Sequence, residues 1–358
     1  MVSSHAPQVD HERARDTMHN LYPLFRPLLF AADPELAHEM VFTGLDAAAR
    51  IGLAQLATPR LPSAPVEAMG LRFPNRVGLA AGLDKNGEHL RGLATLGFGF
   101  LEAGTVTPRA QPGNPRPRMF RIVEAQAIVN RLGFNNAGVD RFVANLDRAR
   151  YRGILGINIG KNFDTPNVRA ADDYVACLRA VHARASYVTI NVSSPNTTGL
   201  RDLQDESALD ALLARVVGER DTLAQRHGKR VPLLVKIAPD LEPDAVRAIA
   251  RLLIHHGVDG VIATNTTLAR DGVDALPHAA EQGGLSGAPL RDRAMATLRT
   301  LAAALEGALT IIAVGGIMSG DEAVERIRAG ATLIQLYTGL IYRGPELVAE
   351  CVRTLAAV

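Results

Sequence analysis

The sequence is poor in the residues that mark several classes of protein. Its 358 positions include two cysteines, no tryptophan and only 4% aromatic residues. Cys177 and Cys351 belong to no Cys/His cluster, so we expect neither a disulfide framework nor a zinc site, and a reducing compartment is favoured. No apolar run reaches the roughly 18 residues that span a bilayer, and the N-terminus lacks a signal-peptide core. We therefore expect a chain that neither crosses a membrane nor is secreted.

Neither basic nor acidic side chains are in large excess. The 39 basic and 37 acidic side chains leave a formal charge of +2, which provides no strong field for binding nucleic acid by counterion release. The hydrophobic share of 47% and the charged share of 21% are typical of a globular protein. A length of 358 residues allows two domains or one large barrel, and no nucleic-acid partner is expected.

The N-terminal region divides into a tail and two short helices. Residues 1–18 are polar and non-periodic, so we predict a disordered tail. Apolar residues at helical spacing predict a first amphipathic helix over 21–29, within an extension that covers 19–58. Asp33 and Pro34 predict the start of a second helix that runs to about Leu53. Three prolines in 57–65 indicate a linker.

Eight apolar, β-branched runs alternate with helical patterns from residue 76 onward. This alternation is typical of parallel strands with crossover helices, so we predict an α/β fold, a TIM (β/α)8 barrel over 59–358 with an N-terminal two-helix extension. The connection 107–140 is unusually long and is predicted to fold over the barrel mouth as a loop or small hairpin. The predicted strands are 76–82, 98–106, 153–161, 187–194, 232–238, 260–265, 309–316 and 333–339.

Side chains able to form hydrogen bonds gather at the ends of these strands. Active sites of barrels are built at the carboxyl ends of the strands, so these residues are candidates for chemistry. Gly316 after the seventh strand and Tyr337 and Thr338 after the eighth lie where barrels commonly bind phosphate, which indicates a phosphorylated ligand. Glycines that serve only tight turns are the alternative.

Lys236 lies inside an apolar run, where a charged group is expensive to bury without a partner. It either touches an electron-rich ligand or forms a Schiff base with a carbonyl. Four asparagines at strand ends and in the long connection offer both donors and acceptors, which suit a planar ligand with alternating carbonyl and N–H groups. They are Asn130, Asn191, Asn196 and Asn265.

Several common motifs are missing. Residues 156–162 resemble a phosphate-binding loop but have the wrong glycine spacing, and no GxGxxG follows the first strand. The ten histidines, including the pair His255 and His256, show no metal-ligand spacing, so we predict no metal. Ser194 within Ser-Ser-Pro carries no meaning by itself.

Nine ordered motifs together resemble the quinone-linked, class 2 dihydroorotate dehydrogenases over about nine-tenths of the chain. The resemblance implies oxidation of dihydroorotate to orotate in pyrimidine biosynthesis, with FMN as internal electron acceptor and ubiquinone or menaquinone as co-substrate. The motifs are GLAAGLDKNG (78–87), GTVTPR (104–109), QPGNPRPR (111–118), NRLGFNNAG (130–138), GINIGKNF (156–163), NVSSPNTT (191–198), VKIAPD (235–240), ATNTT (263–267) and VGGI (314–317).

The resemblance also implies roles for individual residues. Ser194 becomes the base that removes the C5 proton while hydride leaves C6 for FMN. The residues that the resemblance implies bind the substrate are Lys85, Asn130, Arg131, Leu132, Gly133, Phe134, Asn191, Asn196, Asn265 and Thr266. FMN binding falls on Ala81, Gly82, Thr105, Asn158, Asn191, Lys236, Thr264, Gly287, Gly316, Tyr337 and Thr338.

For the extension 19–58 the resemblance implies docking on a membrane and entry of the quinone. Residues 1–60 hold five Arg and seven Asp or Glu, so an anchor there has to be apolar. The expected location is the cytoplasmic face of the bacterial inner membrane, as a peripheral monomer. Alternatively the apolar stripe packs on the barrel. The expected anchor residues are Leu24, Phe25, Leu28, Leu29 and Met40.

Three other interpretations stay open at the level of the sequence. An aldolase or lyase would use Lys236 as a Schiff-base lysine on the same barrel. A class 1 enzyme would use fumarate or NAD, but that class has cysteine where this chain has Ser194. A non-enzymatic scaffold would leave the buried lysine and the amides without a purpose.

Overall fold

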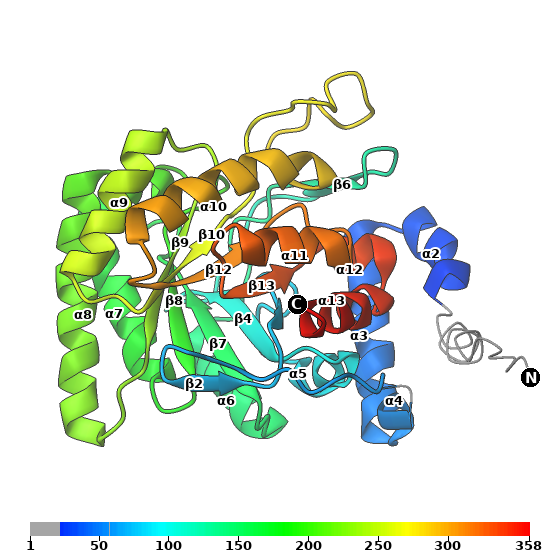
Figure 1. The fold of residues 1–358 in the computed structure, drawn as a ribbon, viewed down its shortest axis with the longest axis horizontal. Coiled ribbons are helices and arrows are strands. Elements are labelled where there is room, and N and C mark those ends of the chain that lie inside the picture. The colour runs from blue at the N-terminus through cyan, green and yellow to red at the C-terminus, as the bar shows by residue number, and fades with distance from the viewer. Residues whose placement is uncertain (1–21, 57) are drawn as a thin grey trace, which may run out of the picture.

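Eight parallel strands close into a barrel in the computed structural model, which describes residues 22–56 and 58–358 (Figure 1). The order around the barrel is β10-β12-β13-β3-β4-β7-β8-β9. Each predicted run contains one strand, which confirms the predicted fold, whereas the predicted tail 1–18 lies outside the described residues. The strands are β3 (Val77–Leu79), β4 (Phe100–Val106), β7 (Ile154–Ile159), β8 (Tyr187–Asn191), β9 (Leu233–Ile237), β10 (Gly260–Ala263), β12 (Thr310–Val314) and β13 (Leu333–Leu336).

Amphipathic helices cover the outside of the barrel. In α9 (Pro243–His255), for example, Val246, Ile249, Ala250 and Leu253 recur at helical spacing and are all buried. This stripe buries apolar surface against the strands, as a crossover helix requires. The other helices of the barrel are α5 (Leu90–Leu93), α6 (Val139–Ala149), α7 (Ala170–Val181), α8 (Glu206–His227), α10 (Arg291–Leu305), α11 (Gly320–Arg328), α12 (Thr338–Arg343) and α13 (Glu346–Ala356).

The amino-terminal end of the barrel is filled by apolar side chains. Phe73 meets Phe100, the first residue of β4, edge to face with ring centroids 5.1 Å apart. Phe73 belongs to a hairpin of β1 (Val66–Ala68) and β2 (Leu71–Phe73), which the sequence did not reveal. With this end closed, the opening of the barrel lies at the carboxyl ends of the strands.

A second, three-stranded sheet lies over that opening. The hairpin predicted within 107–140 is present as β5 (Met119–Ile122) and β6 (Ala127–Asn130). Its third strand, β11 (Gly284–Gly287), comes from the loop after β10 and pairs antiparallel with β6. The sequence analysis missed β11 because half of this four-residue strand is glycine, which predicts a turn.

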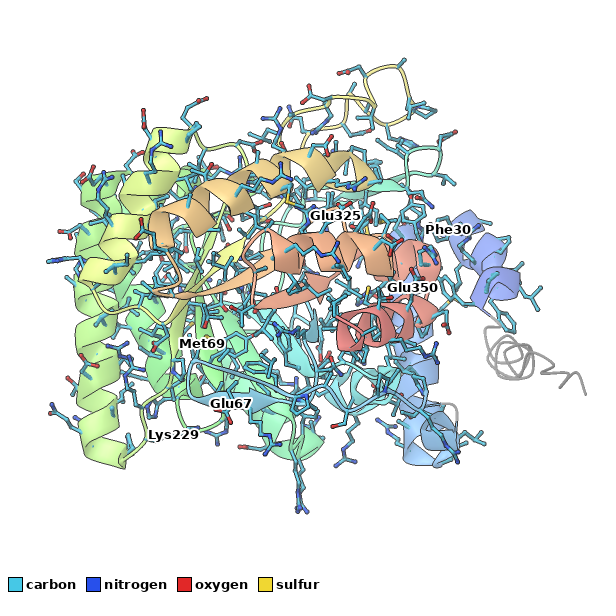
Figure 2. The ribbon with its side chains drawn as sticks, viewed as in Figure 1. Phe30, Glu67, Met69, Lys229, Glu325 and Glu350 are labelled. Atoms are coloured by element: carbon cyan, nitrogen blue, oxygen red, sulfur yellow. The ribbon has the colours of Figure 1, made fainter. Side chains whose placement is uncertain are left out.

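The N-terminal extension forms α2 (Tyr22–Ala31), α3 (Pro34–Arg50) and α4 (Leu53–Leu56) at one side of the barrel (Figure 1). Asp33 caps α3, since its carboxylate accepts from the backbone N–H groups of Glu35 and Leu36 at 3.0 Å, which confirms the predicted helix start. Phe30 of α2, which is labelled in Figure 2, meets Tyr342 edge to face with ring centroids 5.1 Å apart. Both predicted helices are therefore present and are attached to the barrel by one face. None of the described helices is long and apolar enough to cross a bilayer.

Candidate active site

A cavity opens where the carboxyl ends of the barrel strands converge below the three-stranded sheet. It encloses about 960 Å³ of space free of atoms, a volume that includes open solvent at its mouth. Its walls come from the loop after β3, from the ends of β4, β8, β9, β10, β12 and β13, and from β6 and β11. The cavity therefore lies where the sequence predicted the chemistry of the barrel.

Two lysines line this cavity without a protein acceptor for their ammonium groups. Within 22–56 and 58–358, neither Lys85 nor Lys236 donates a hydrogen bond, although Lys236 is only 5% exposed. Burial lowers the pKa of Lys85 to about 8, and it also lowers the pKa of Lys236, against the opposing field of Glu102. A buried ammonium group without an acceptor is costly, so both lysines are suited to a ligand with anionic or carbonyl oxygens.

One chain of hydrogen bonds orients the amide of Asn191. Its Nδ2 donates to Thr105 Oγ1 and to Asn158 Oδ1, both at 3.0 Å, and Asn158 Nδ2 in turn donates to Glu102 at 2.8 Å. Asn158 is fully buried and contacts these side chains from below the cavity. The side-chain amide of Asn191 is therefore held in a fixed orientation before a ligand binds.

The other asparagines are linked across loops that are far apart in sequence. Asn196 Nδ2 donates to Asn130 Oδ1 at 3.1 Å, which joins the loop after β8 to the hairpin. Asn265 Nδ2 donates to Ser193 Oγ at 3.0 Å, and Ser193 Oγ donates to Asn191 Oδ1 at 2.9 Å. All four predicted asparagines therefore meet around one cavity.

Ser194 lies in this rim, 5% exposed, in the loop that follows β8. Its Oγ accepts from the backbone N–H of Asn196 at 3.2 Å, and its hydroxyl proton has no acceptor among the described residues. Arg201 fixes the loop, because it donates to the carbonyl of Ser193 at 3.1 Å and to that of Thr266 at 2.7 Å. The Ser194 hydroxyl is thus held at the wall of the cavity while its proton stays available.

Glycines shape the opposite end of the cavity. Gly316 has φ +71°, and a Cβ there would lie 2.4 Å from Arg291 Cα; Gly287 has φ +96°, and its Cβ would lie 2.2 Å from the carbonyl oxygen of Gln126. Glycine is therefore required at both positions for these segments to pack against their neighbours. Both glycines also line the cavity, where a residue without a side chain suits a phosphate. Thr338 Oγ1 adds a hydroxyl here and donates to Ser286 at 2.9 Å.

Arg131, Asn158 and Lys161 lie outside the cavity wall. Arg131, predicted as a substrate residue, pairs instead with Glu281 at 2.7 Å, while Lys161 donates to the carbonyl of Thr165 at 2.8 Å. The predicted residues that line the cavity are Ala81, Gly82, Lys85, Thr105, Asn130, Leu132, Gly133, Phe134, Asn191, Ser194, Asn196, Lys236, Thr264, Asn265, Thr266, Gly287, Gly316, Tyr337 and Thr338.

Several lining residues belong to no predicted site, among them Ser286, Leu290 and Gln335. Ser286 belongs to β11, the strand that the sequence did not reveal, and Leu290 follows this strand. Gln335 lies in a predicted strand, two residues after Leu333, so both side chains point to the inside of the barrel. This alternation could have identified Gln335 from the sequence.

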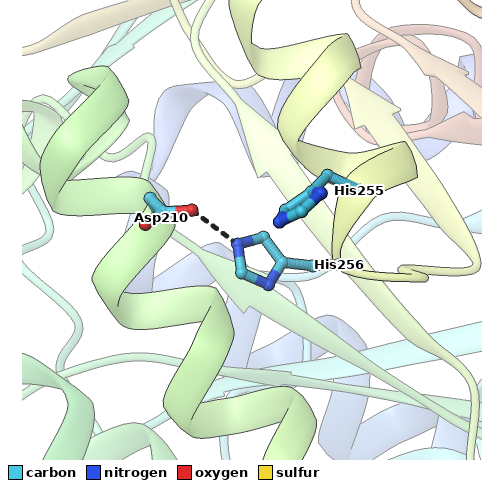
Figure 3. A group of neighbouring side chains, drawn as sticks. All are labelled: Asp210, His255 and His256. Atoms are coloured by element: carbon cyan, nitrogen blue, oxygen red, sulfur yellow. Dashed lines mark hydrogen bonds and ion pairs between the residues drawn. The ribbon is translucent and has the colours of Figure 1, made fainter.

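A histidine cluster lies outside this cavity. Asp210 of α8 lies beside His255 and His256 at the end of α9, and His256 Nε2 is 2.8 Å from Asp210 Oδ1 (Figure 3). Asp210 and His255 are exposed, and His256 is partly buried. None of the three lines the cavity, so the cluster plays no part in the site described above.

Comparison with known proteins agrees with this geometry. The sequence profile of the dihydroorotate dehydrogenase family matches residues 63–358. Over 336 residues the chain is 62% identical to a dihydroorotate dehydrogenase (quinone) of Thiobacillus denitrificans, covering 94% of this chain and 99% of that one. The corresponding protein of Burkholderia thailandensis is 61% identical over 337 residues, which are 94% of this chain and 98% of that one.

A solved structure shares the whole architecture. The dihydroorotate dehydrogenase of Eimeria tenella in complex with ferulenol superposes with a TM-score of 0.81 at 40% identity, covering 90% of this chain and 91% of that one. The aldolase and scaffold interpretations find no support in these comparisons. The chain belongs to the dihydroorotate dehydrogenase family.

Proposed function

We propose that this protein oxidises dihydroorotate to orotate in pyrimidine biosynthesis and passes the electrons to a quinone through bound FMN. The observation that carries this proposal is one cavity that unites two lysines without protein acceptors, four linked asparagines and the hydroxyl of Ser194. The relatives named dihydroorotate dehydrogenase (quinone), which match nearly the full chain, support the same reaction.

The residues present suit FMN. The backbone around Gly287 and Gly316, with the hydroxyl of Thr338, suits the phosphate, and Lys236 and Thr105 suit the polar edge of the ring. FMN supplies the hydride acceptor when it is bound. With FMN bound, Lys236 would place a positive charge at the polar edge of the ring, and that charge would stabilise the negative charge that reduction of the ring creates.

The substrate would be held by groups whose directions are already set. Lys85 offers its ammonium group to the carboxylate, and the amides of Asn130, Asn191, Asn196 and Asn265 offer donors and acceptors to the ring edges. Hydrogen bonds among these asparagines and Ser193 keep them in place, so substrate binding needs little further ordering of side chains.

Ser194 is the proposed base that takes the proton from C5. A serine hydroxyl is a weak base, so it depends on a position close to the substrate and on a cavity from which water is excluded. The backbone N–H of Asn196 already donates to its Oγ, and the sheet of β5, β6 and β11 covers the opening. The C5 proton would pass to Ser194, whose own hydroxyl proton passes to a hydrogen-bonded water or neighbour, while hydride would leave C6 for the flavin.

The N-terminal helices are the proposed entry for the quinone. Their outer face is strongly apolar: Leu24 is 73% exposed, Phe25 55%, Leu28 72% and Met40 57%. Such a face favours insertion into the boundary of a lipid bilayer. We therefore propose a peripheral protein on the cytoplasmic face of the bacterial inner membrane. We also propose that it works as a monomer.

The visible spectrum of the purified protein tests the function directly. The proposal expects a yellow protein whose flavin absorbance bleaches when dihydroorotate is added without oxygen and returns when a soluble quinone follows. A colourless protein that is trapped by borohydride in the presence of a carbonyl substrate would instead identify Lys236 as a Schiff-base lysine.

Binding of dihydroorotate should weaken as the pH rises through about 8. Lys85 has its pKa lowered to about 8, so its ammonium charge is present below that pH and lost above it. We expect kcat/KM for dihydroorotate to fall about tenfold per pH unit beyond this point, because kcat/KM reports groups of the free enzyme. In Lys85→Arg the charge persists, so the fall near pH 8 should vanish. If it stays, another group is responsible.

Gly316→Ala should abolish retention of FMN. Its added Cβ would lie 2.4 Å from Arg291 Cα, at a residue whose φ of +71° already disfavours a side chain. Gly307→Ala is the matched control, because Gly307 has φ +81° but no atom within 4 Å of the added Cβ. The ratio of FMN to protein after gel filtration measures the outcome. Equal FMN content in both variants would contradict the assigned phosphate position.

A further inference from the structure

Glu102 is a carboxylate inside the barrel that the proposed reaction does not use. It lies on β4 with 0% exposure, nearer to the closed end of the barrel than the cavity wall. Asn158 Nδ2 donates to its Oε1 at 2.8 Å, whereas Tyr187 Oη at 2.9 Å and Gln335 Nε2 at 2.7 Å donate to its Oε2. Three donors from three other strands satisfy a group that would otherwise be very costly to bury.

These three donors leave neither carboxylate oxygen without a hydrogen bond. Tyr187 remains a neutral donor, because burial and the neighbouring Glu102 raise its pKa well above the ordinary value. Gln335 also lines the cavity, and its Oε1 is a buried acceptor without a partner among the described residues. The carboxylate network therefore reaches from the barrel interior to the cavity floor.

Lys236 lies next to this network in the barrel: it pairs in the sheet with Asn191, which donates to Asn158, and Asn158 donates to Glu102. Burial lowers the pKa of Lys236, and Glu102 is the one titratable group that acts on it in the opposite direction. The interaction is coulombic rather than a hydrogen bond, and it operates inside the barrel, where solvent does not screen it. Two opposite charges are thus buried together, one at the cavity and one beneath it.

We propose that Glu102 is a positioning residue that keeps Lys236 protonated beside the flavin and thereby raises the reduction potential of the bound flavin. The inference rests on the proposed function, since it needs Lys236 at the flavin ring. Glu102 acts through Lys236 and does not itself line the cavity.

The variant Glu102→Gln separates this role from a simple field effect. Loss of a nearby negative charge, acting alone, would raise the midpoint potential of the flavin at every pH. If Glu102 keeps Lys236 charged, the Lys236 ammonium group of the variant should instead lose its proton at a pH about one to three units lower than in wild type. Its midpoint potential should therefore exceed that of wild type at low pH and fall below it at higher pH, so that the two curves cross.

The experiment measures midpoint potential against pH by spectroelectrochemistry on the flavin-loaded, full-length protein. Glu67→Gln removes the same charge from an exposed position on β1 (Figure 2) and should reproduce the wild-type curve. In a Lys236→Met background the crossing should disappear, and Glu102→Gln should then raise the potential throughout. If Glu102→Gln does not fold, Tyr187→Phe, which removes one donor to the carboxylate, should shift the curve in the same direction by less.

A uniform rise in potential, or a curve identical to wild type, would refute the role of Glu102. The result for Lys236→Met shows which proposal has failed. If Lys236→Met changes the potential but Glu102→Gln gives no crossing, only this inference is wrong. If Lys236→Met leaves both the potential and the spectrum unchanged, Lys236 is not at the flavin, and the FMN assignment of the proposed function is wrong.

Discussion

Ser194→Ala is expected to slow reduction of the flavin by dihydroorotate by about two to four orders of magnitude, the usual contribution of a proton-transferring group. The flavin should stay bound, because Ser194 lies at the rim with the asparagines rather than in the glycine-lined end of the cavity. Anaerobic stopped-flow measurement of the first turnover tests this step without interference from quinone.

Ser194→Cys is the matched variant for this test. A thiol occupies nearly the same space and can also take a proton, so part of the rate should return and rise with pH as the thiolate forms. Near-normal first-turnover reduction in Ser194→Ala would remove Ser194 as the base. Loss of bound flavin in that variant would instead indicate a structural role.

A triple substitution on the outer face of α2, Leu24→Asp, Phe25→Asp and Leu28→Asp, is expected to abolish rapid quinone turnover. These side chains are more than half exposed, so the fold should tolerate the change. Each apolar side chain that enters lipid contributes up to about 1.5–3 kcal/mol, so loss of all three should weaken binding to phospholipid vesicles by roughly a hundredfold or more. Reduction of the flavin by dihydroorotate should be unchanged.

Vesicle co-sedimentation and steady-state turnover with a long-chain quinone measure these two effects. Ile254→Asp on α9 is the control, since Ile254 is 45% exposed on a different helix. Wild-type vesicle binding and quinone turnover in the triple variant would show that the exposed stripe does not dock on a membrane. The helices would then be attached only to the barrel, through contacts of their inner face such as that of Phe30 with Tyr342.

The sequence predicted those parts of the structure that depend on local pattern. The eight strands could be recognised because each is a short apolar run, and Asp33 could be recognised as a helix cap because capping needs neighbours only two or three residues away. The positions of Lys236 and the asparagines at strand ends followed from the barrel itself, since all strand ends meet at one rim.

The directions of long side chains could not be predicted in the same way. Arg131 was predicted to bind substrate only because its motif resembles that of the family, and in the structure its guanidinium pairs with Glu281, which is 150 positions away. Asn158 follows the barrel pattern but turns its polar atoms to Glu102, Thr105 and Asn191. Partners contributed by distant segments decide such orientations, and spacing along the chain does not encode them.

The amino-acid sequence by itself determined the barrel, the family and the residues that gather at the rim, because periodicity and ordered motifs are properties of the chain. Tertiary structure alone decided which charges face one another. Glu102 appears in the sequence as an ordinary strand residue, and only closure of the barrel brings Asn158, Tyr187 and Gln335 to its carboxylate and buries it in the same barrel as Lys236. The reason is physical: electrostatic interaction depends on distance and burial in space, and both are set when strands far apart in sequence close around one axis.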